Sequence, residues 1–166
     1  MPTPESTVIE ATLCFALRHD PVHQILLGRK KRGFGKGKLN GIGGKIEPGE
    51  RPLDCILREV QEEVGIELYP SSVQEMGQIT FRFPFHPDYD HYVHVFLATE
   101  WHGEPTETPE MAPEWFNVDD IPYSEMWQDD AHWLPRVLAG EHIRATFIFG
   151  ADNETLTDWE IERVSA

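Results

Sequence analysis

The segment that decides the fold spans residues 44–66 and reads GKIEPGERPLDCILREVQEEVGI. Its second half carries the signals of an α-helix over residues 51–64. Pro52 suits the first helical position, and Gly65 suits the C-terminal cap. Apolar residues recur at helical spacing and form one stripe: Leu53, Ile56, Leu57, Val60 and Val64. We therefore expect this helix to pack one face against a hydrophobic core.

Three glutamates, Glu59, Glu62 and Glu63, lie at positions i, i+3 and i+4 and share one helix face beside that stripe. A cation between them would offset their repulsion, and hard oxygen ligands favour Mg²⁺, Mn²⁺ or Ca²⁺ over zinc. Such an ion can grip phosphate oxygens and activate a water. Arg58 can fix a neighbouring carboxylate through a bidentate hydrogen bond. Taken alone, however, the three glutamates fit an ordinary solvated acidic helix better.

The spacing of the wider segment resembles the Nudix box: Gly, five residues, Glu, seven residues, Arg-Glu, an aliphatic residue, one residue, Glu-Glu, one residue, Gly, an aliphatic residue. Every fixed place is filled, by Gly44, Glu50, Arg58, Glu59, Val60, Glu62, Glu63, Gly65 and Ile66. At average residue usage, such a match at a given start has a probability on the order of 10⁻⁸. The resemblance implies an α/β fold, an α/β/α sandwich with a mixed β-sheet. It also implies that metal-activated water attacks a phosphorus of a nucleoside diphosphate linked to another group.

The same resemblance assigns roles to residues in and around the box. The metal ligands it implies are Gly43, through its carbonyl, and Glu59, Glu62, Glu63 and Glu110. The ion is expected to be Mg²⁺, with Mn²⁺ as the alternative. Glu50 and Arg58 complete the catalytic set by orienting the loop and the carboxylates, and Lys45 is expected to meet phosphate. Which residue acts as the general base stays open among Glu62, Glu63 and Glu110.

Segments outside the box resemble the mammalian-type oxidised purine nucleoside triphosphatases, relatives of the MutT enzymes. The similar segments occur in the same order: 28–35, 39–45, 77–81, 94–96, 110–111, 115–116, 121–122 and 126–130. The resemblance extends from about residue 11 to residue 164. It implies that the substrate-binding residues are Thr12, Lys30, Phe34, Asn40, Lys45, Phe81, Trp127, Asp129 and Asp130.

Recognition of an oxidised base is expected to depend on Asp129 and Asp130, with Trp127 stacked on the base. Stacking of a base on an aromatic ring contributes about 1–3 kcal/mol. Two adjacent carboxyls in a partly apolar pocket cannot both ionise cheaply, so one is expected to hold a proton. The pair then offers one donor and one acceptor. An 8-oxopurine presents an N7–H donor beside the O6 acceptor, whereas guanine presents only acceptors on that edge.

These residues also have ordinary structural interpretations. Asp129 and Asp130 suit the N-terminus of a helix, where carboxylates cap free N–H groups. Trp127 fits core packing, which is the commoner position for a lone tryptophan. Asn40 fits a turn beside Gly41. Each interpretation is open at this stage.

The sequence departs from the triphosphatase pattern around the expected base pocket. Leu39 stands where the similar sequences carry an aromatic residue, Gln128 stands where they carry proline, and the hairpin at residues 85–91 differs. These departures bear on base preference rather than on reaction type. The hairpin is rich in histidine, but His91 and His94 should point to opposite faces of a strand, which argues against a transition-metal site.

Composition limits the classes of function. The chain has 166 residues and a formal net charge of -15, so we expect one domain over residues 1–166 and no long nucleic acid as partner. No apolar run approaches the roughly 20 residues that span a bilayer, and the first residues lack a signal-peptide pattern. A cytoplasmic monomer is expected. Cys14 and Cys55 fit small core residues better than a disulfide.

The pattern of apolar residues, glycines and prolines predicts an alternation of strands and two helices. The expected strands are 7–18, 24–30, 39–42, 73–83, 92–101, 114–118, 143–149 and 155–164, and the expected helices are 51–64 and 129–138. Pro135 should kink or shorten the second helix. Strands mixed with two helices indicate a sheet packed between helices.

Taken together, the sequence predicts a Mg²⁺-dependent pyrophosphohydrolase that sanitises the nucleotide pool, converting 8-oxo-dGTP to 8-oxo-dGMP and pyrophosphate. One alternative is a Nudix hydrolase of another substrate, namely a dinucleoside polyphosphate, a nucleotide sugar or capped RNA. A second alternative is a non-catalytic nucleotide sensor, although the complete set of Glu59, Glu62 and Glu63 disfavours it. The preference between oxidised guanine and oxidised adenine, and the number of metal ions, stay open.

Overall fold

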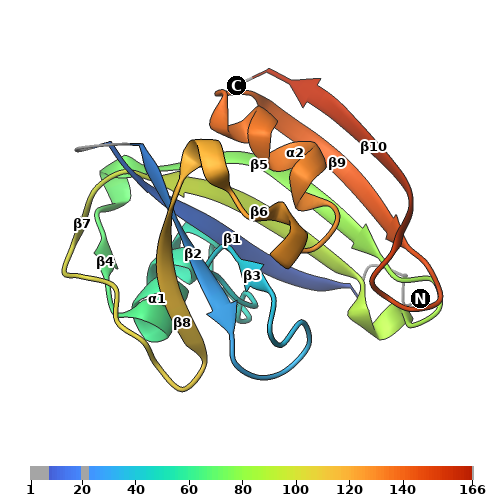
Figure 1. The fold of residues 1–166 in the computed structure, drawn as a ribbon, viewed down its shortest axis with the longest axis horizontal. Helices are drawn as coiled ribbons and strands as arrows, with labels where there is room; N and C mark the ends of the chain where they lie inside the picture. The colour runs from blue at the N-terminus through green and yellow to red at the C-terminus, as the bar shows by residue number, and fades with distance from the viewer. Residues whose placement is uncertain (1–7, 20–22, 166) are drawn as a thin grey trace.

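The structure of the chain is a computed structural model that describes residues 8–19 and 23–165. The strands are β1 (Ile9–Arg18), β2 (Gln24–Lys30), β3 (Leu39–Asn40), β4 (Glu67–Leu68), β5 (Val73–Arg82), β6 (His91–Ala98), β7 (Trp101–His102), β8 (Met111–Asn117), β9 (His142–Phe149) and β10 (Leu156–Val164). The α-helices are α1 (Pro52–Val64) and α2 (Asp130–Leu138). The main sheet runs β10-β9-β5-β6-β1-β2-β3, with β8 paired to β2 (Figure 1).

The main sheet is mixed, as predicted. β1 pairs in parallel with β6, and β5 with β9, while the other pairs of neighbouring strands in this sheet are antiparallel. Among the described residues, β1 and β2 pair only at Leu17 with Ile25 and at Arg18 with Gln24, where the two strands are closest in sequence. Farther along β1, the segment at residues 42–45 lies beside the strand in place of β2. There the Thr12 N–H donates to the Gly44 carbonyl at 2.8 Å, which fixes the start of the box against the sheet.

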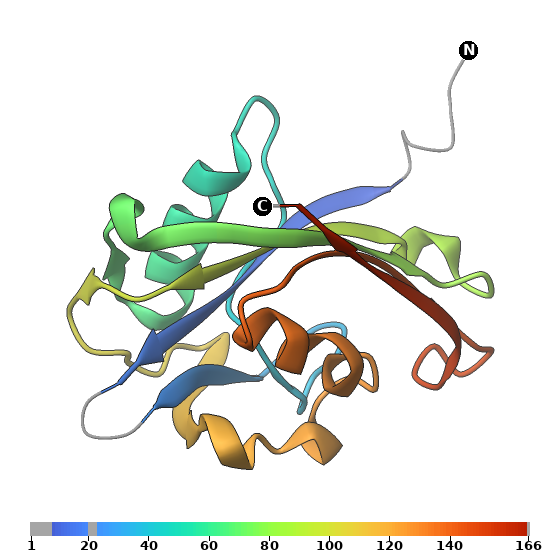
Figure 2. The same ribbon diagram turned by 90° about the horizontal axis from the view of Figure 1, so that it is seen from above.

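Both faces of the sheet are buried because the side chains of β1 alternate between two cores. Cys14 and Ala16 face α1, whereas Phe15 and Leu17 face α2. Figure 2 shows the two helices on opposite sides of the sheet. The predicted α/β/α arrangement is therefore confirmed.

The core under α1 is formed by the apolar stripe that the sequence predicts. Ile56 and Val64 are completely buried, and Leu53 and Leu57 lie at the margin. Full burial of each such aliphatic side chain stabilises the fold by about 1.5–3 kcal/mol. The helix ends at Gly65, whose φ of 76° is left-handed and whose N–H donates to the Gln61 carbonyl.

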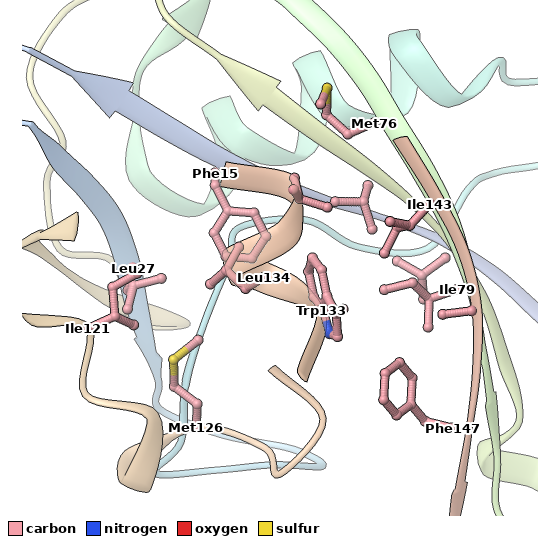
Figure 3. Close-up of a cluster of buried hydrophobic side chains, with 14 of the residues drawn as sticks. Phe15, Leu27, Met76, Ile79, Ile121, Met126, Trp133, Leu134, Ile143 and Phe147 are labelled. Carbon is pink, nitrogen blue, oxygen red and sulfur yellow. The ribbon is translucent and has the colours of Figure 1, made fainter. Parts of the chain in front are cut away.

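The core under α2 contains the larger side chains (Figure 3). Trp133 is fully buried, and its ring meets Phe15 edge-on at a centroid distance of 5.8 Å. Pro135 lies inside α2. Because Pro135 has no N–H, the helix loses the hydrogen bond to the Ala131 carbonyl, a cost that this nine-residue helix tolerates.

Several expected boundaries were wrong. The strand predicted over residues 92–101 ends at Ala98, and Trp101–His102 instead forms β7, which pairs with the unpredicted β4. The strand predicted over 39–42 stops at Asn40, because Ile42 turns to pair with Cys14 of β1. β8 starts earlier than predicted, and its Pro113 is tolerated because β8 pairs only with β2 in the main sheet.

Three other expectations concern the chain as a whole. The residue at position 7, where the first strand was expected to start, lies outside the described residues. Cys14 and Cys55 are both free and buried, as predicted. In the part of the chain that the structure describes, no helix is long and apolar enough to cross a membrane.

Candidate active site

The inner edge of α1 carries two buried carboxyls, Glu59 and Glu63. The pKa of Glu59 is raised to about 7 and that of Glu63 to about 8, chiefly by burial and in smaller part by the nearby charge of Glu110. A Cβ atom at Gly44 would lie 1.8 Å from Oε2 of Glu59, so a side chain at this position would displace the Glu59 carboxyl. The loop and the helix thus bring these carboxyls to the start of the box.

A bidentate ion pair joins Arg58 of α1 to Glu50, which precedes the helix. Arg58 donates from Nε to Oε2 of Glu50 at 2.8 Å and from Nη2 to Oε1 at 2.9 Å. These hydrogen bonds lower the pKa of Glu50 to about 2. Nη2 of Arg58 also donates to the Lys45 carbonyl at 3.3 Å. Arg58 therefore joins the loop to the helix, which is the geometry that an orienting role requires.

Two other expected metal ligands, Glu62 and Glu110, pair with arginines. Glu62 has a side chain that is 56% exposed and pairs with Arg58, and Glu110 pairs with Arg32. Accordingly, within residues 8–19 and 23–165, no three Asp, Glu, His or Cys side chains already surround one cation position. Oε2 of Glu63, however, is buried without a hydrogen-bond partner among the described residues.

A divalent cation fits this pair of glutamates. Their two carboxyls are desolvated, and their raised pKa values show that the charged forms lack enough compensating positive charge. Carboxylate oxygens are also the ligands that Mg²⁺ and Mn²⁺ prefer. The assignment of individual ligands, Gly43, Glu62 and Glu110 included, stays a prediction.

A pocket of about 230 Å³ extends from Glu63 to Asp129 and Asp130. It is smaller than the roughly 300–1,000 Å³ of pockets that enclose drug-sized ligands, and so suits one heterocyclic base. Of the predicted substrate-binding residues, all but Lys45 line it: Thr12, Lys30, Phe34, Asn40, Phe81, Trp127, Asp129 and Asp130. Gly43, Gly44 and Glu63 line it as well, so the pocket reaches the buried carboxyl of Glu63.

The pocket contains two adjacent buried carboxyls, Asp129 and Asp130, which are 3% and 4% exposed. Asp129 accepts a hydrogen bond from Nε1 of Trp133 at 2.8 Å. Burial raises the pKa of Asp129 to about 6, and burial together with the charge of Asp129 raises that of Asp130 well above its usual range. Asp130 therefore holds a proton when Asp129 is ionised. Asp129 occupies the N-cap position of α2 and Asp130 its first turn, as the structural interpretation predicts, but the Asp129 side chain makes no capping hydrogen bond.

The other two structural interpretations describe only part of what is found. Trp127 packs against Phe34 at 5.1 Å and against Phe149 at 5.7 Å between ring centroids, but it also faces the pocket. Asn40 lies in β3 opposite Gly28 rather than in a turn. Lys45 lies outside the pocket lining and contributes its backbone carbonyl to Arg58.

Several pocket residues were missed by sequence analysis. Phe83 and Phe149 stack at 4.8 Å and line the pocket together. Phe83 follows Phe81 at the two-residue spacing of a strand, so this signal was present in the sequence. His91 also lines the pocket, and burial lowers its pKa. His94 does not line the pocket and contacts Glu75 at 2.8 Å, so the structure does not bring His91 and His94 together.

Comparison with known proteins identifies the family. The model of the NUDIX domain matches residues 10–137 of the chain. The chain belongs to the Nudix family.

Two relatives of this Nudix protein share most of its length. An oxidized purine nucleoside triphosphate hydrolase of Mus musculus is 39% identical over 143 residues, which cover 86% of this chain and 89% of the relative. A protein of the same description from Danio rerio is 42% identical over 126 residues, covering 76% and 79% of the two chains. The crystal structure of a MutT protein from Bacillus halodurans superposes with a TM-score of 0.78 at 27% identity, over 93% of this chain and 98% of that one.

Proposed function

We propose that this Nudix protein hydrolyses oxidised purine nucleoside triphosphates, such as 8-oxo-dGTP, to the monophosphate and pyrophosphate with Mg²⁺. The observation that carries the proposal is the buried carboxyl pair Asp129 and Asp130 beside Trp127 in a pocket of the size of a base. The mouse and zebrafish relatives, described as oxidized purine nucleoside triphosphate hydrolases, support it.

Selection of the base follows because Asp130 is protonated while Asp129 is ionised. The protonated Asp130 donates a hydrogen bond to O6 of the base, and the ionised Asp129 accepts one from the N7–H that only the oxidised base has. Guanine presents an acceptor at N7, which would face the ionised carboxylate without a hydrogen. A buried acceptor left unpaired costs roughly 1–3 kcal/mol, which is about five- to 150-fold in discrimination. The Trp133 donor keeps the negative charge on Asp129.

The phosphates extend from this pocket towards Glu59 and Glu63. Lys30 lines the same pocket, and its charge lowers the pKa of Glu63, so its ammonium group lies within electrostatic reach of both the glutamate and an incoming phosphate. A bound Mg²⁺ ion would be held by these carboxylates, and it would neutralise phosphate charge and activate water. Arg58 keeps Glu50 and the loop in place, so that the carboxylates are positioned before the nucleotide arrives.

The pocket draws on residues from β1, Thr12, through to the end of β9, Phe149. We therefore propose that the chain works as one domain, and that catalysis needs both the box and the C-terminal half.

The test is a competition between 8-oxo-dGTP and dGTP at equal low concentrations with Mg²⁺, with the products separated by chromatography. We expect selective release of 8-oxo-dGMP and pyrophosphate. Asp129→Asn should remove most of the selectivity, because asparagine has no charged acceptor for the N7–H. Asp130→Asn should keep it, since the amide still donates to O6, and Asp119→Asn, the same change at an exposed position, should leave it intact. Glu63→Gln should abolish turnover while nucleotide binding persists. Equal turnover of the two nucleotides by the wild type, or unchanged selectivity in Asp129→Asn, would overturn the proposal.

A further inference from the structure

A second cavity, of about 550 Å³, lies outside the base pocket. The two cavities share only Phe34 and Trp127 among their lining residues. The centroids of these two rings are 5.1 Å apart and their planes are inclined by 35°. Phe34 and Trp127 thus form a wall between the base pocket and the outer cavity, here named the ring wall.

The three ring contacts of Phe34 all come from outside its own segment, although hydrogen bonds such as that from the Gly37 N–H to the Lys30 carbonyl close the loop backbone. It lies in the loop at residues 31–38, between Gly33 and Gly35, which both have left-handed φ angles of 83° and 85°. Its carbonyl accepts a hydrogen bond from Nζ of Lys30 at 2.7 Å, but its side chain is 37% exposed. Glycine loses more conformational entropy on folding than other residues do, so ordering a glycine-rich loop costs more free energy. The position of the Phe34 ring therefore depends on the rings around it.

Tyr89 is the ring that covers Phe34 on the outer side. Their centroids are 4.2 Å apart at an inclination of 33°, the shortest of the three ring contacts that Phe34 makes. Tyr89 lines the outer cavity and does not line the base pocket. It therefore reaches the base pocket through Phe34 and, at a longer centroid distance of 5.8 Å, through Phe83.

The hairpin that carries Tyr89 is firmly held. The Phe83 N–H donates to Oδ1 of Asp90 at 2.7 Å, and the Ile9 N–H donates to the Asp90 carbonyl at 3.0 Å. The ring of His86 lies 3.8 Å from that of Tyr89. A ring on a fixed hairpin is thus stacked on a ring in a glycine-rich loop.

We propose that Tyr89 is a positioning residue for base recognition: by stacking on Phe34 it keeps the ring wall in place. The proposal rests on the proposed function for the identity of the base, but the contact itself does not. An aromatic pair of this kind is typically worth enough to change an equilibrium about two- to tenfold. Loss of Tyr89 should therefore raise KM by about that factor and leave kcat unchanged, because the glutamate site is untouched.

The experiment compares Tyr89→Ala, Tyr89→Leu and Tyr89→Phe with Phe85→Ala. Phe85 lies in the same hairpin, is 68% exposed, and is a matched aromatic control. Amide hydrogen exchange of residues 33–38 is measured without nucleotide, and KM and kcat are measured with 8-oxo-dGTP and Mg²⁺. We expect faster exchange in the loop and a raised KM for the Ala and Leu variants, with rescue by Phe and no effect at position 85.

Two outcomes would overturn the role of Tyr89. One is unchanged exchange of the loop in both Tyr89→Ala and Tyr89→Leu. The other is a fall in kcat with KM unchanged, which would place the effect at the glutamate site. A wild-type protein that fails to prefer 8-oxo-dGTP would refute the proposed function instead, and the exchange comparison would still decide whether Tyr89 holds Phe34.

Discussion

Replacing Trp133 with phenylalanine should weaken both the core and the discrimination between bases. Trp133 is fully buried, and Nε1 donates to Oδ2 of the buried Asp129 at 2.8 Å. Phenylalanine cannot donate this hydrogen bond, and an unpaired buried acceptor costs about 1–3 kcal/mol. The smaller ring also leaves space next to Phe15, which adds roughly 1 kcal/mol. We expect a loss of about 2–4 kcal/mol in the free energy of unfolding.

This loss can be measured as a fall in Tm. In a protein of this length, 1 kcal/mol corresponds to about 2–4 °C, so Trp133→Phe should melt roughly 4–16 °C lower. The effect on pH dependence has a definite sign. The Trp133 hydrogen bond lowers the pKa of Asp129, so its removal should raise that pKa. The acid limb of the selectivity for 8-oxo-dGTP should therefore move to higher pH.

Thermal unfolding and a pH series of kcat/KM for 8-oxo-dGTP and dGTP check both parts. Leu134→Met, a change of similar character at another fully buried position in α2, is the control, because it should lower Tm slightly without shifting the pH profile. A Trp133→Phe variant with an unchanged Tm and an unchanged pH profile would refute the argument that this indole orients Asp129.

Further predictions concern the glutamate site and His94 in β6. Gly44→Ala should displace Glu59, since the added Cβ would meet its Oε2 at 1.8 Å, and should lower kcat and the affinity for Mn²⁺ measured by paramagnetic resonance. Removal of divalent ions by a chelator should stop turnover, and added Mg²⁺ should restore it, whereas persistent turnover would contradict the metal site. The hydrogen bond from His94 to Glu75 raises the pKa of His94, with Glu10 also facing it. His94→Gln should therefore destabilise the fold most below the unfolded histidine pKa, and progressively less as pH rises through the folded pKa. Denaturant unfolding of wild type and variant measures this loss below the unfolded pKa and above the folded pKa. An equal loss of unfolding free energy at both pH values would contradict the prediction.

The sequence predicted the fold where local signals and tertiary packing agree. Helix α1 was predicted almost to the residue, because Pro52, the apolar stripe and Gly65 all specify the same element. Strand β2 was predicted with its observed ends at Gln24 and Lys30. The two-residue strands β4 and β7 were missed, because their pairing is set by the fold around them and leaves too short a pattern in the chain.

The base pocket was predicted mainly through resemblance, and the structure explains what resemblance could not reach. Asp129 looks like a helix cap in sequence, and only the buried indole of Trp133 shows where its carboxylate points. Tyr89 could not be connected with Phe34, because their contact joins a loop after β2 to a hairpin after β5. The orientation of Glu62 towards Arg58 was likewise inaccessible, since helical spacing fixes only the face and not the rotamer.

The most direct test of the account is the ratio of kcat/KM for 8-oxo-dGTP over dGTP, followed from acid to alkaline pH in the wild type and in Asp130→Asn. The account predicts that the wild-type ratio is greatest while Asp129 is ionised and Asp130 is protonated, and that it declines on either side. The Asn variant keeps a permanent donor at position 130 and should lose the alkaline decline. A wild-type ratio that stays constant with pH, or an identical profile in the variant, would contradict recognition of the oxidised base by this carboxyl pair.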